Sequence, residues 1–277
     1  MSKKLFLTLL ITSCLSSTIN AKDYSDDIHK NDNRWINLNL MYAVDELPGN
    51  SNHDYLEIEF GGRSGIMDLY GYIDIFNLTN SKNSDKNGKE KTFIKFNPRF
   101  SIDALTGEDL SFGAIQEIYL ATMITWSGNS GYTGEHNNPN GINEAFLGIG
   151  SDIIFPWFDK VGLNLYGVYD INEKEWNGYQ LSTNWFKPFY FFENNSFISY
   201  QGYIDYQFGA KEKNIKGVGA LTTNRGGAMY NGVYWHADSY SIGYGLKAYS
   251  DVYTLKNNGI VGKTTGFAHY FSLAYKF

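Results

Sequence analysis

Apolar and polar residues alternate with a period of two through most of the chain after residue 33. In the last strand-like stretch, Phe271, Leu273, Tyr275 and Phe277 share one face, and mostly small or polar residues occupy the other. Successive side chains of a β-strand point to opposite faces, so this period predicts strands that separate an apolar environment from a polar one. One alternating strand is equally compatible with a soluble sheet, so the number and arrangement of such segments must decide.

Twelve such segments, separated by polar stretches, each predict one β-strand. The expected strands are residues 34–45, 54–61, 65–76, 92–102, 115–124, 143–151, 162–171, 178–186, 197–208, 227–236, 240–249 and 266–277. On nearly every one, acidic, basic or amide side chains share the face opposite the apolar one. A soluble β-sandwich would not place acids and bases on the inner face of nearly every strand, whereas in a closed barrel the inner face lines water.

The connections between these segments alternate in length. Long polar connections are expected at residues 46–53, 77–91, 125–142, 209–226 and 250–265, and those between them are mostly shorter, such as 62–64 and 237–239. Short turns on one side, long loops on the other and an even strand number are typical of bacterial outer-membrane barrels. The predicted fold is therefore all-β: a closed antiparallel transmembrane β-barrel of about 12 strands.

The N-terminal stretch has the pattern of a secretory signal peptide. It begins with Lys3 and Lys4, continues with an apolar run and ends at Ala21. Cys14 lies in a sequence that loosely fits a lipoprotein cleavage site, so lipidation at this residue is the alternative. The expected organisation is a signal peptide over residues 1–21, a periplasmic N-terminal tail over 22–33 and the transmembrane barrel over 34–277. Since Cys14 is the only cysteine, cleavage after Ala21 leaves no internal disulfide.

Composition agrees with an exported barrel and excludes several classes of protein. The mean hydropathy is −0.35 and no long apolar run follows the leader, which excludes a bundle of membrane helices. Aromatic residues make up 17% of the chain, and tyrosine and tryptophan favour membrane interfaces. Loss of Lys3 and Lys4 would take the net charge from −6 to −8, which argues against nucleic acid as a partner.

No catalytic or metal site is predicted. Residues 235–239 bring His236, Asp238 and Ser239 together, but three groups on one tight turn cannot easily form a base-oriented nucleophile. The other histidines lack the spacing of metal ligands. We therefore expect neither enzymatic activity nor a cofactor.

Five stretches carry a more specific resemblance. They are DLYGYIDI (68–75), NPRFSIDALTGEDLSFGAIQEIYLAT (97–122), FLGIGSDI (146–153), LNLYGVY (163–169) and NEKEWNGYQ (172–180). In these stretches, and in register over residues 34–277, the chain resembles the Tsx-type nucleoside-specific channels of the Gram-negative outer membrane. That family includes related porins that phages use as receptors in vibrios.

The resemblance implies a monomeric barrel in the outer membrane with a narrow pore for passive uptake of nucleosides and deoxynucleosides. It also implies contact with outer-membrane lipid and lipopolysaccharide, assembly by the barrel assembly machinery, and use of the loops by a phage or colicin. The terminal strand is similar to the sorting signal of such barrels, with Phe271, Leu273, Tyr275 and Phe277 facing lipid.

Inward-facing residues of the expected strands are the candidate substrate-binding residues of the lumen. The charged candidates are Glu57, Glu59, Asp68, Asp74, Lys95, Arg99 and Lys247, and the aromatic candidates are Tyr70, Tyr72, Tyr119, Phe146, Tyr166 and Tyr203. Aromatic rings can stack on a base, and polar or charged groups can bind ribose hydroxyls. The alternative for the charged residues is a salt-bridge network that holds the barrel together, and for the aromatic residues it is lumen packing.

The first long loop departs from the family pattern. The resemblance implies an aromatic residue there that grips the base, but residues 45–53 contain none and the nearest match is Leu47. Two other functions therefore stay open. One is a general pore for small solutes, and the other is a receptor or adhesion barrel with an occluded lumen.

Overall fold

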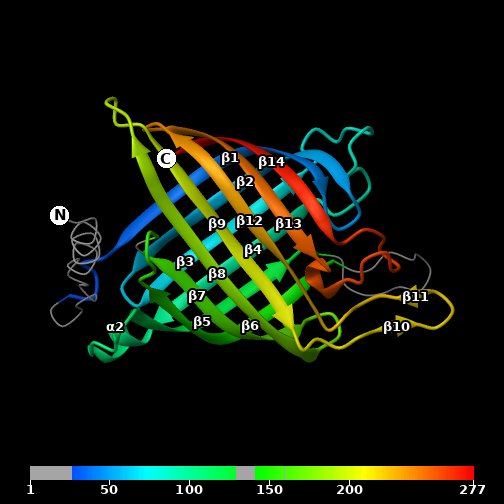
Figure 1. Ribbon diagram of the computed structural model, residues 1–277, viewed down its shortest axis with the longest axis horizontal. Coiled ribbons are helices and arrows are strands. Elements are labelled where there is room, and N and C mark those ends of the chain that lie inside the picture. Colours follow the sequence, from blue (N-terminus) through cyan, green and yellow to red (C-terminus); the bar gives the residue numbers. More distant parts are fainter. Residues whose placement is uncertain (1–26, 129–140, 159) are drawn as a thin grey trace, which may run out of the picture.

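The computed structural model describes residues 27–128, 141–158 and 160–277, which form one closed antiparallel barrel (Figure 1). Its strands are β1 (Asn33–Glu46), β2 (Ser51–Ser64), β3 (Met67–Phe76), β4 (Thr92–Ser101), β5 (Ile115–Trp126), β6 (Asn143–Ile153), β7 (Val161–Asp170), β8 (Glu175–Phe191), β9 (Phe197–Phe208), β12 (Arg225–His236), β13 (Tyr240–Ser250) and β14 (Gly266–Lys276). The predicted twelve-stranded barrel is thus confirmed. The expected signal peptide, Cys14 and the first part of the tail lie outside the described residues.

The barrel closes through the first and last strands. β1 pairs with β2 on one side and with β14 on the other, where Leu40 lies opposite Leu273. The last residue takes part as well, because the Phe277 N–H donates to the Ile36 carbonyl at 3.1 Å. Closure pairs strand edges that would otherwise stay open, which is the condition for a sheet to stand in lipid.

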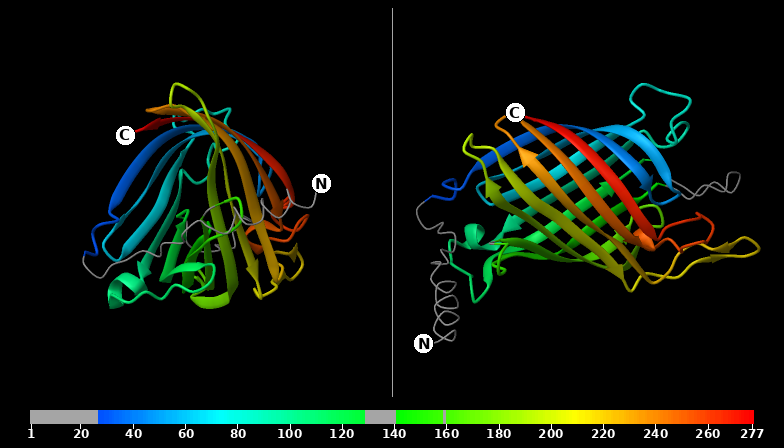
Figure 2. Two further views of the ribbon diagram at one scale, coloured as in Figure 1. Left: turned by 60° about the vertical axis from the view of Figure 1, so that its left-hand side comes forward. Right: turned by 45° about the horizontal axis from the view of Figure 1, so that its top comes forward.

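The two ends of the barrel differ. At one end, here called the short-turn end, β1 begins, β14 ends and the helix α2 (Ile102–Thr106) lies at the rim (Figure 2). The opposite, long-loop end carries the connections 77–91, 209–224 and 251–265, of which the second holds the small hairpin of β10 (Asn214–Ile215) and β11 (Gly219–Ala220). Among the described residues, no helix is both long and apolar enough to cross a membrane.

Four expected boundaries were wrong. The short turn expected at residues 62–64 lies within β2, which continues to Ser64. The long connection expected at residues 46–53 shrinks to residues 47–50, because a bulge between Ala43 and Glu46 lets β1 and β2 pair as far as Ser51. The strand expected at 92–102 ends at Ser101, whose Oγ accepts the Ala104 N–H and caps α2. The eighth strand is longer than expected, because the β8–β9 ladder continues across a second bulge to Phe191.

Polarity is inverted relative to a soluble protein. Large apolar side chains cover the outer wall, and Leu40, Leu147, Ile149 and Ile242 are each more than half exposed. Buried residues that face the interior include many polar and charged ones, such as Glu117 at 1%. An apolar outer band around a polar lumen is the arrangement that lipid requires. The terminal-strand residues Phe271, Leu273, Tyr275 and Phe277 belong to this band, at 49%, 48%, 40% and 75% exposed.

Candidate functional site

A cavity lies inside the barrel, toward the long-loop end, and the space between its walls, part of it open to solvent, is about 530 Å³. Its wall combines aromatic, charged and amide side chains, which are Tyr72, Phe93, Lys95, Met123, Thr125, Glu144, Phe146, Gln180, Tyr203, Asp205, Gln207, Gly227, Ala228, Lys247, Val252 and Tyr253. Five of the residues predicted from the sequence are among them: Tyr72, Lys95, Phe146, Tyr203 and Lys247.

One ion pair crosses this cavity. Lys95 Nζ on β4 lies 2.9 Å from Asp205 Oδ2 on β9, and four strands separate β4 from β9 around the wall. Ser182 Oγ holds the other Asp205 oxygen at 2.6 Å. A second contact spans β6 and β9, since the Gln207 amide donates to both Glu144 oxygens at 3.2 Å. These contacts narrow the lumen and leave polar groups beside the rings.

Lys247 is placed differently from Lys95. Its ammonium lies 5.1 Å from the ring centre of Tyr249, 5.6 Å from that of Tyr203 and 5.8 Å from that of Tyr270. Within the described part of the chain, no carboxylate lies within 4.0 Å of it and it has no hydrogen-bond acceptor. The three rings stabilise the charge by cation–π contact and leave its N–H donors available to an oxygen on a solute.

A row of aromatic rings leads from the cavity to the short-turn end. We call Tyr203, Tyr230, Tyr234, His236 and Phe197 the aromatic track. The Tyr203 and Tyr230 rings stack at 5.7 Å and 15°, the Tyr230 and Tyr234 hydroxyls are hydrogen-bonded, and His236 stacks on Phe197 at 4.6 Å and 16°. Of these five residues, only Tyr203 was predicted from the sequence.

Two glycines of β13, the strand next to β12, leave room for the rings of Tyr230 and Tyr234. A Cβ on Gly245 would lie 2.0 Å from the Tyr230 Oη, and one on Gly243 would lie 2.1 Å from Cδ1 of Tyr234. Both rings therefore lie flat against the wall over positions that no larger residue could occupy. The sequence does carry the signal, because Gly243 and Gly245 are the small residues of the inward face of residues 241–247. In the strand register Gly243 lies opposite Tyr234, and Gly245 lies opposite Gly232, between Tyr230 and Tyr234.

A second group of predicted residues lies on β2 and β3, away from the cavity. Glu59 accepts from Tyr70 Oη at 3.0 Å and from Asn37 Nδ2 at 3.2 Å. Glu57 accepts from Asn39 Nδ2 at 2.6 Å, and Asp74 lies directly opposite it in the strand register. Glu57 and Glu59 are thus engaged by the wall of the lumen, whereas Asp74 Oδ1 is buried without a hydrogen-bond partner among the residues that the structure describes.

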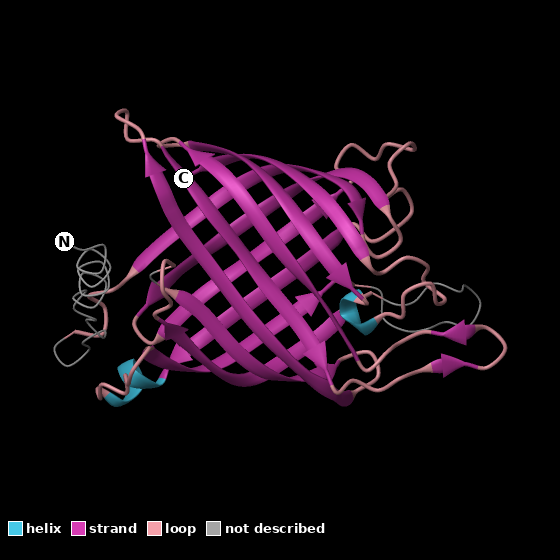
Figure 3. Ribbon diagram, viewed as in Figure 1, coloured by secondary structure: helices cyan, strands magenta, loops and turns pink. Residues whose placement is uncertain are grey.

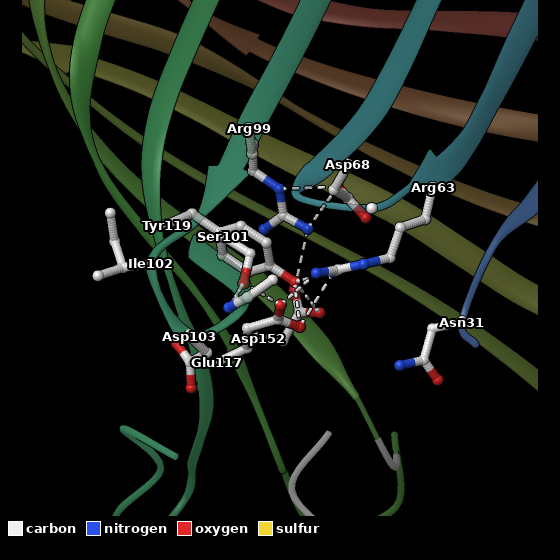
Figure 4. Close-up of polar contacts among 12 residues, drawn as sticks. Asn31, Arg63, Asp68, Arg99, Ser101, Ile102, Asp103, Glu117, Tyr119 and Asp152 are labelled. Carbon is white, nitrogen blue, oxygen red and sulfur yellow. Dashed lines mark hydrogen bonds and ion pairs between the residues drawn. The ribbon is translucent and has the colours of Figure 1, made fainter. Parts of the chain in front are cut away.

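The third group closes part of the short-turn end with charge, and we call it the ion network (Figure 4). It consists of Arg63, Asp68, Arg99, Ser101, Glu117, Tyr119 and Asp152. Arg63 binds Glu117 with both terminal nitrogens, at 2.6 and 3.1 Å. Arg99 bridges Asp68 at 2.8 Å and Asp152 at 3.0 Å.

Tyr119 is enclosed by this network. It is 0% exposed, the Arg99 guanidinium lies 4.1 Å from its ring centre, and its hydroxyl donates to Glu117 at 2.6 Å. The structure therefore places Tyr119, Asp68 and Arg99 in a packed ion network and not at the cavity. The sequence analysis missed Arg63, Glu117 and Asp152 as members; Arg63 fell in an expected turn.

Tyr166 lies between the cavity and the ion network. It is 1% exposed, its ring meets Phe146 edge to face at 5.8 Å, and its hydroxyl accepts from Asn97 Nδ2 at 3.0 Å. This geometry makes Tyr166 a support beneath Phe146.

His236 belongs to the aromatic track. Its Nε2 is 2.8 Å from the Ser199 hydroxyl, and Ser199 is 0% exposed. The pair is shielded by rings on both sides. Among residues 27–128, 141–158 and 160–277, no cluster of three potential metal ligands occurs.

Comparison with known proteins gives consistent matches. The family described as nucleoside-specific channel-forming protein Tsx matches residues 30–277. Outer membrane protein OmpK of Vibrio parahaemolyticus serotype O3:K6 is 59% identical over 276 residues, covering 99% of this chain and 100% of that protein. Tsx of Salmonella typhimurium is 30% identical over 222 residues, covering 75% of each chain, and Tsx of Klebsiella pneumoniae is 29% identical over 262 residues, covering 87% and 86%.

Proposed function

Because the chain belongs to the Tsx family of nucleoside-specific channel-forming proteins, its barrel is a channel of the Gram-negative outer membrane, and we propose that nucleosides and deoxynucleosides are the solutes it admits. In barrels of this kind short turns face the periplasm and long loops face outward. The cavity thus lies on the outer side of the ion network, and solutes meet it first.

The observation that supports nucleosides is the combination of a stacked ring pair with free donors at one cavity. Tyr203 stacks on Tyr230 and also stands 5.6 Å from the Lys247 ammonium. An aromatic ring stacks on a nucleobase with a free energy of about 1–3 kcal/mol, whichever base it is. Lys247 and the Lys95–Asp205 pair offer partners for a carbonyl oxygen and for ribose hydroxyls.

Weak binding at several places suits a channel, because a solute held tightly would not leave. The aromatic track continues the same type of surface toward the periplasm, past the side of the lumen that the ion network fills. We propose that the solute moves along this track by passive diffusion, without chemical change.

The short first turn does not supply an aromatic ring. Leu47 is 3% exposed and packs with Met41, Tyr55 and Tyr270 inside the mouth. Loop 77–91 reaches the same place, where Lys86 Nζ lies 3.0 Å from Glu46 Oε2. We propose that the base is gripped deeper, at Tyr203 and the Tyr72–Phe93 pair, whose ring centres are 6.1 Å apart.

The proposal extends to the partners of the barrel. Outer-membrane lipid and lipopolysaccharide would contact the apolar outer band, the assembly machinery would read β14, and the barrel would work as a monomer. A phage or colicin would bind the long loops.

A liposome swelling assay separates the candidate functions. Proteoliposomes would be challenged with adenosine, a disaccharide and an amino acid. The nucleoside proposal expects adenosine to enter faster than its size alone allows. A general pore expects rates ordered by size, and a receptor barrel with an occluded lumen expects no swelling with any solute.

A further inference from the structure

The connection after β13 turns into the mouth of the barrel. Its first residues form the short helix η1 (Val252–Thr254), visible at the rim opposite α2 (Figure 3). Val252 is 3% exposed and belongs to the same apolar cluster as Leu47 and Phe76. Tyr253, next to it, lines the cavity together with Lys247 and Tyr203. An outer loop thus supplies part of the inner wall.

The backbone of this segment is strained. Asp251, Tyr253 and Thr254 have φ values of 44°, 56° and 56°, in the left-handed region. Residues with a Cβ rarely adopt this conformation, and it is least favourable for a β-branched residue such as Thr254. Strain of this kind persists only where the surroundings enforce it, and it concentrates at functional sites.

A set of hydrogen bonds enforces it here. Asp251 Oδ1 accepts the Asn257 N–H at 2.7 Å, and Asn257 Oδ1 accepts the Thr264 N–H at 2.9 Å. Thr264, which is 0% exposed, donates its hydroxyl to the Leu255 carbonyl at 2.8 Å. A hydrogen bond also joins this loop to the connection 209–224, because the Thr223 N–H donates to the Thr254 carbonyl at 2.8 Å.

These bonds do not require an aromatic residue at position 253. Among the described residues, Asp251, Asn257 and Thr264 make no hydrogen bond to the Tyr253 side chain, yet the strained backbone directs that ring to the cavity. A glycine or asparagine would satisfy the same left-handed φ at lower cost. The tyrosine is therefore explained by what it does in the lumen.

We infer that Tyr253 is the constriction residue of the outer mouth, and that its ring, held in place by the Asp251–Asn257–Thr264 hydrogen bonds, sets the size limit of solutes that reach the cavity. This inference rests on the barrel being a channel, and not on the choice of nucleosides as its solutes.

Single-channel recording in planar bilayers tests the inference with three substitutions. Tyr253→Gly and Tyr253→Asn remove the ring and suit the backbone, and Tyr253→Phe keeps the ring. Tyr240→Ala, which removes an outward tyrosine of β13 that is 54% exposed, is the matched control. Folded barrel is verified first by its gel shift on heating.

We expect the potassium chloride conductance of Tyr253→Gly and Tyr253→Asn to rise about twofold, while Tyr253→Phe and Tyr240→Ala stay at the parent value. The smallest polyethylene glycol excluded from the pore should increase in the first two variants alone. Unchanged conductance and polymer exclusion in both would overturn the inference. Neither readout involves a nucleoside, so failure here is distinct from failure of the proposed function.

Discussion

Arg63 and Glu117 face each other across the lumen from strands that are not neighbours. Arg63 lies on β2 and Glu117 on β5, their side chains are 2% and 1% exposed, and the closest N–O distance is 2.6 Å. The pair is bidentate, and Ser101 and Tyr119 donate to the same carboxylate. The contact therefore braces the barrel from inside at the short-turn end.

Removing one member of this pair should destabilise the barrel strongly. Glu117→Ala leaves the Arg63 charge buried without its main partner, which typically costs about 3–5 kcal/mol. The temperature at which the folded gel band disappears should fall accordingly. The double variant Arg63→Met with Glu117→Leu should recover most of the loss, because neither charge is then buried. Equal stability of Glu117→Ala and the parent would contradict the brace.

Adding a methyl group at Gly245 should narrow the lumen. The new Cβ would fall 2.0 Å from the Tyr230 Oη, so the ring must leave the wall and enter the pore. Gly245→Ala should therefore lower the single-channel conductance, and adding Tyr230→Ala should restore it. A Gly245→Ala channel with the conductance of the parent would contradict the close contact between the Tyr230 ring and Gly245.

A charge at the last residue should block assembly and spare transport by any barrel that does fold. Phe277 is 75% exposed in the outer band, and its ring lies 4.8 Å from that of Tyr275. Phe277→Asp places a carboxylate at a lipid-facing position, where charge is unfavourable. Outer-membrane fractions should contain little heat-shifting barrel, whereas Phe277→Tyr should be normal. Parent levels of folded Phe277→Asp would refute the sorting role.

The hydrogen bond that joins Asp32, just before β1, to Gly65 in the β2–β3 turn should depend on pH. The Gly65 N–H donates to Asp32 at 2.8 Å, and this bond, followed by that from His29, holds the pKa of Asp32 below its ordinary value of 3.8. A lowered pKa means that the stabilisation is present above the unfolded value and is lost as the pH falls through the folded one. Hydrogen exchange at the Gly65 amide should be slower in the parent than in Asp32→Ala at neutral pH. The difference should shrink only as the pH falls below 3.8, and it should vanish below the lowered pKa of Asp32 in the folded protein. A difference that persists in acid would contradict the assignment.

The alternation of residues was sufficient to predict the strands, because a lipid-facing wall forces a strict period of two. It also identified inward residues such as Lys95, Tyr203 and Lys247 as facing one space. It could not pair them, since Lys95 and Asp205 are 110 residues apart and meet across a lumen whose width depends on closure.

Contacts between distant residues, and residues in irregular loops, could not be predicted from the sequence. Arg63 follows two glycines, Gly61 and Gly62, so the sequence predicted a turn there, yet Arg63 is the inward residue that meets Glu117. Tyr253 lies in a loop with no periodicity, and only its left-handed backbone brings it to the cavity. The family-like block at residues 97–122 contains four members of the ion network, which are Arg99, Ser101, Glu117 and Tyr119.

Block of the ion current by nucleosides tests the central claim most directly. Adenosine or thymidine would be added at millimolar levels to single parent channels in a planar bilayer. The account predicts a saturable decrease of the potassium chloride current, weakened about fivefold or more in Tyr203→Ala, which loses the stacking ring, and unchanged in Tyr240→Ala. A parent current that neither nucleoside affects would contradict the nucleoside assignment and leave a channel whose solutes are of another class.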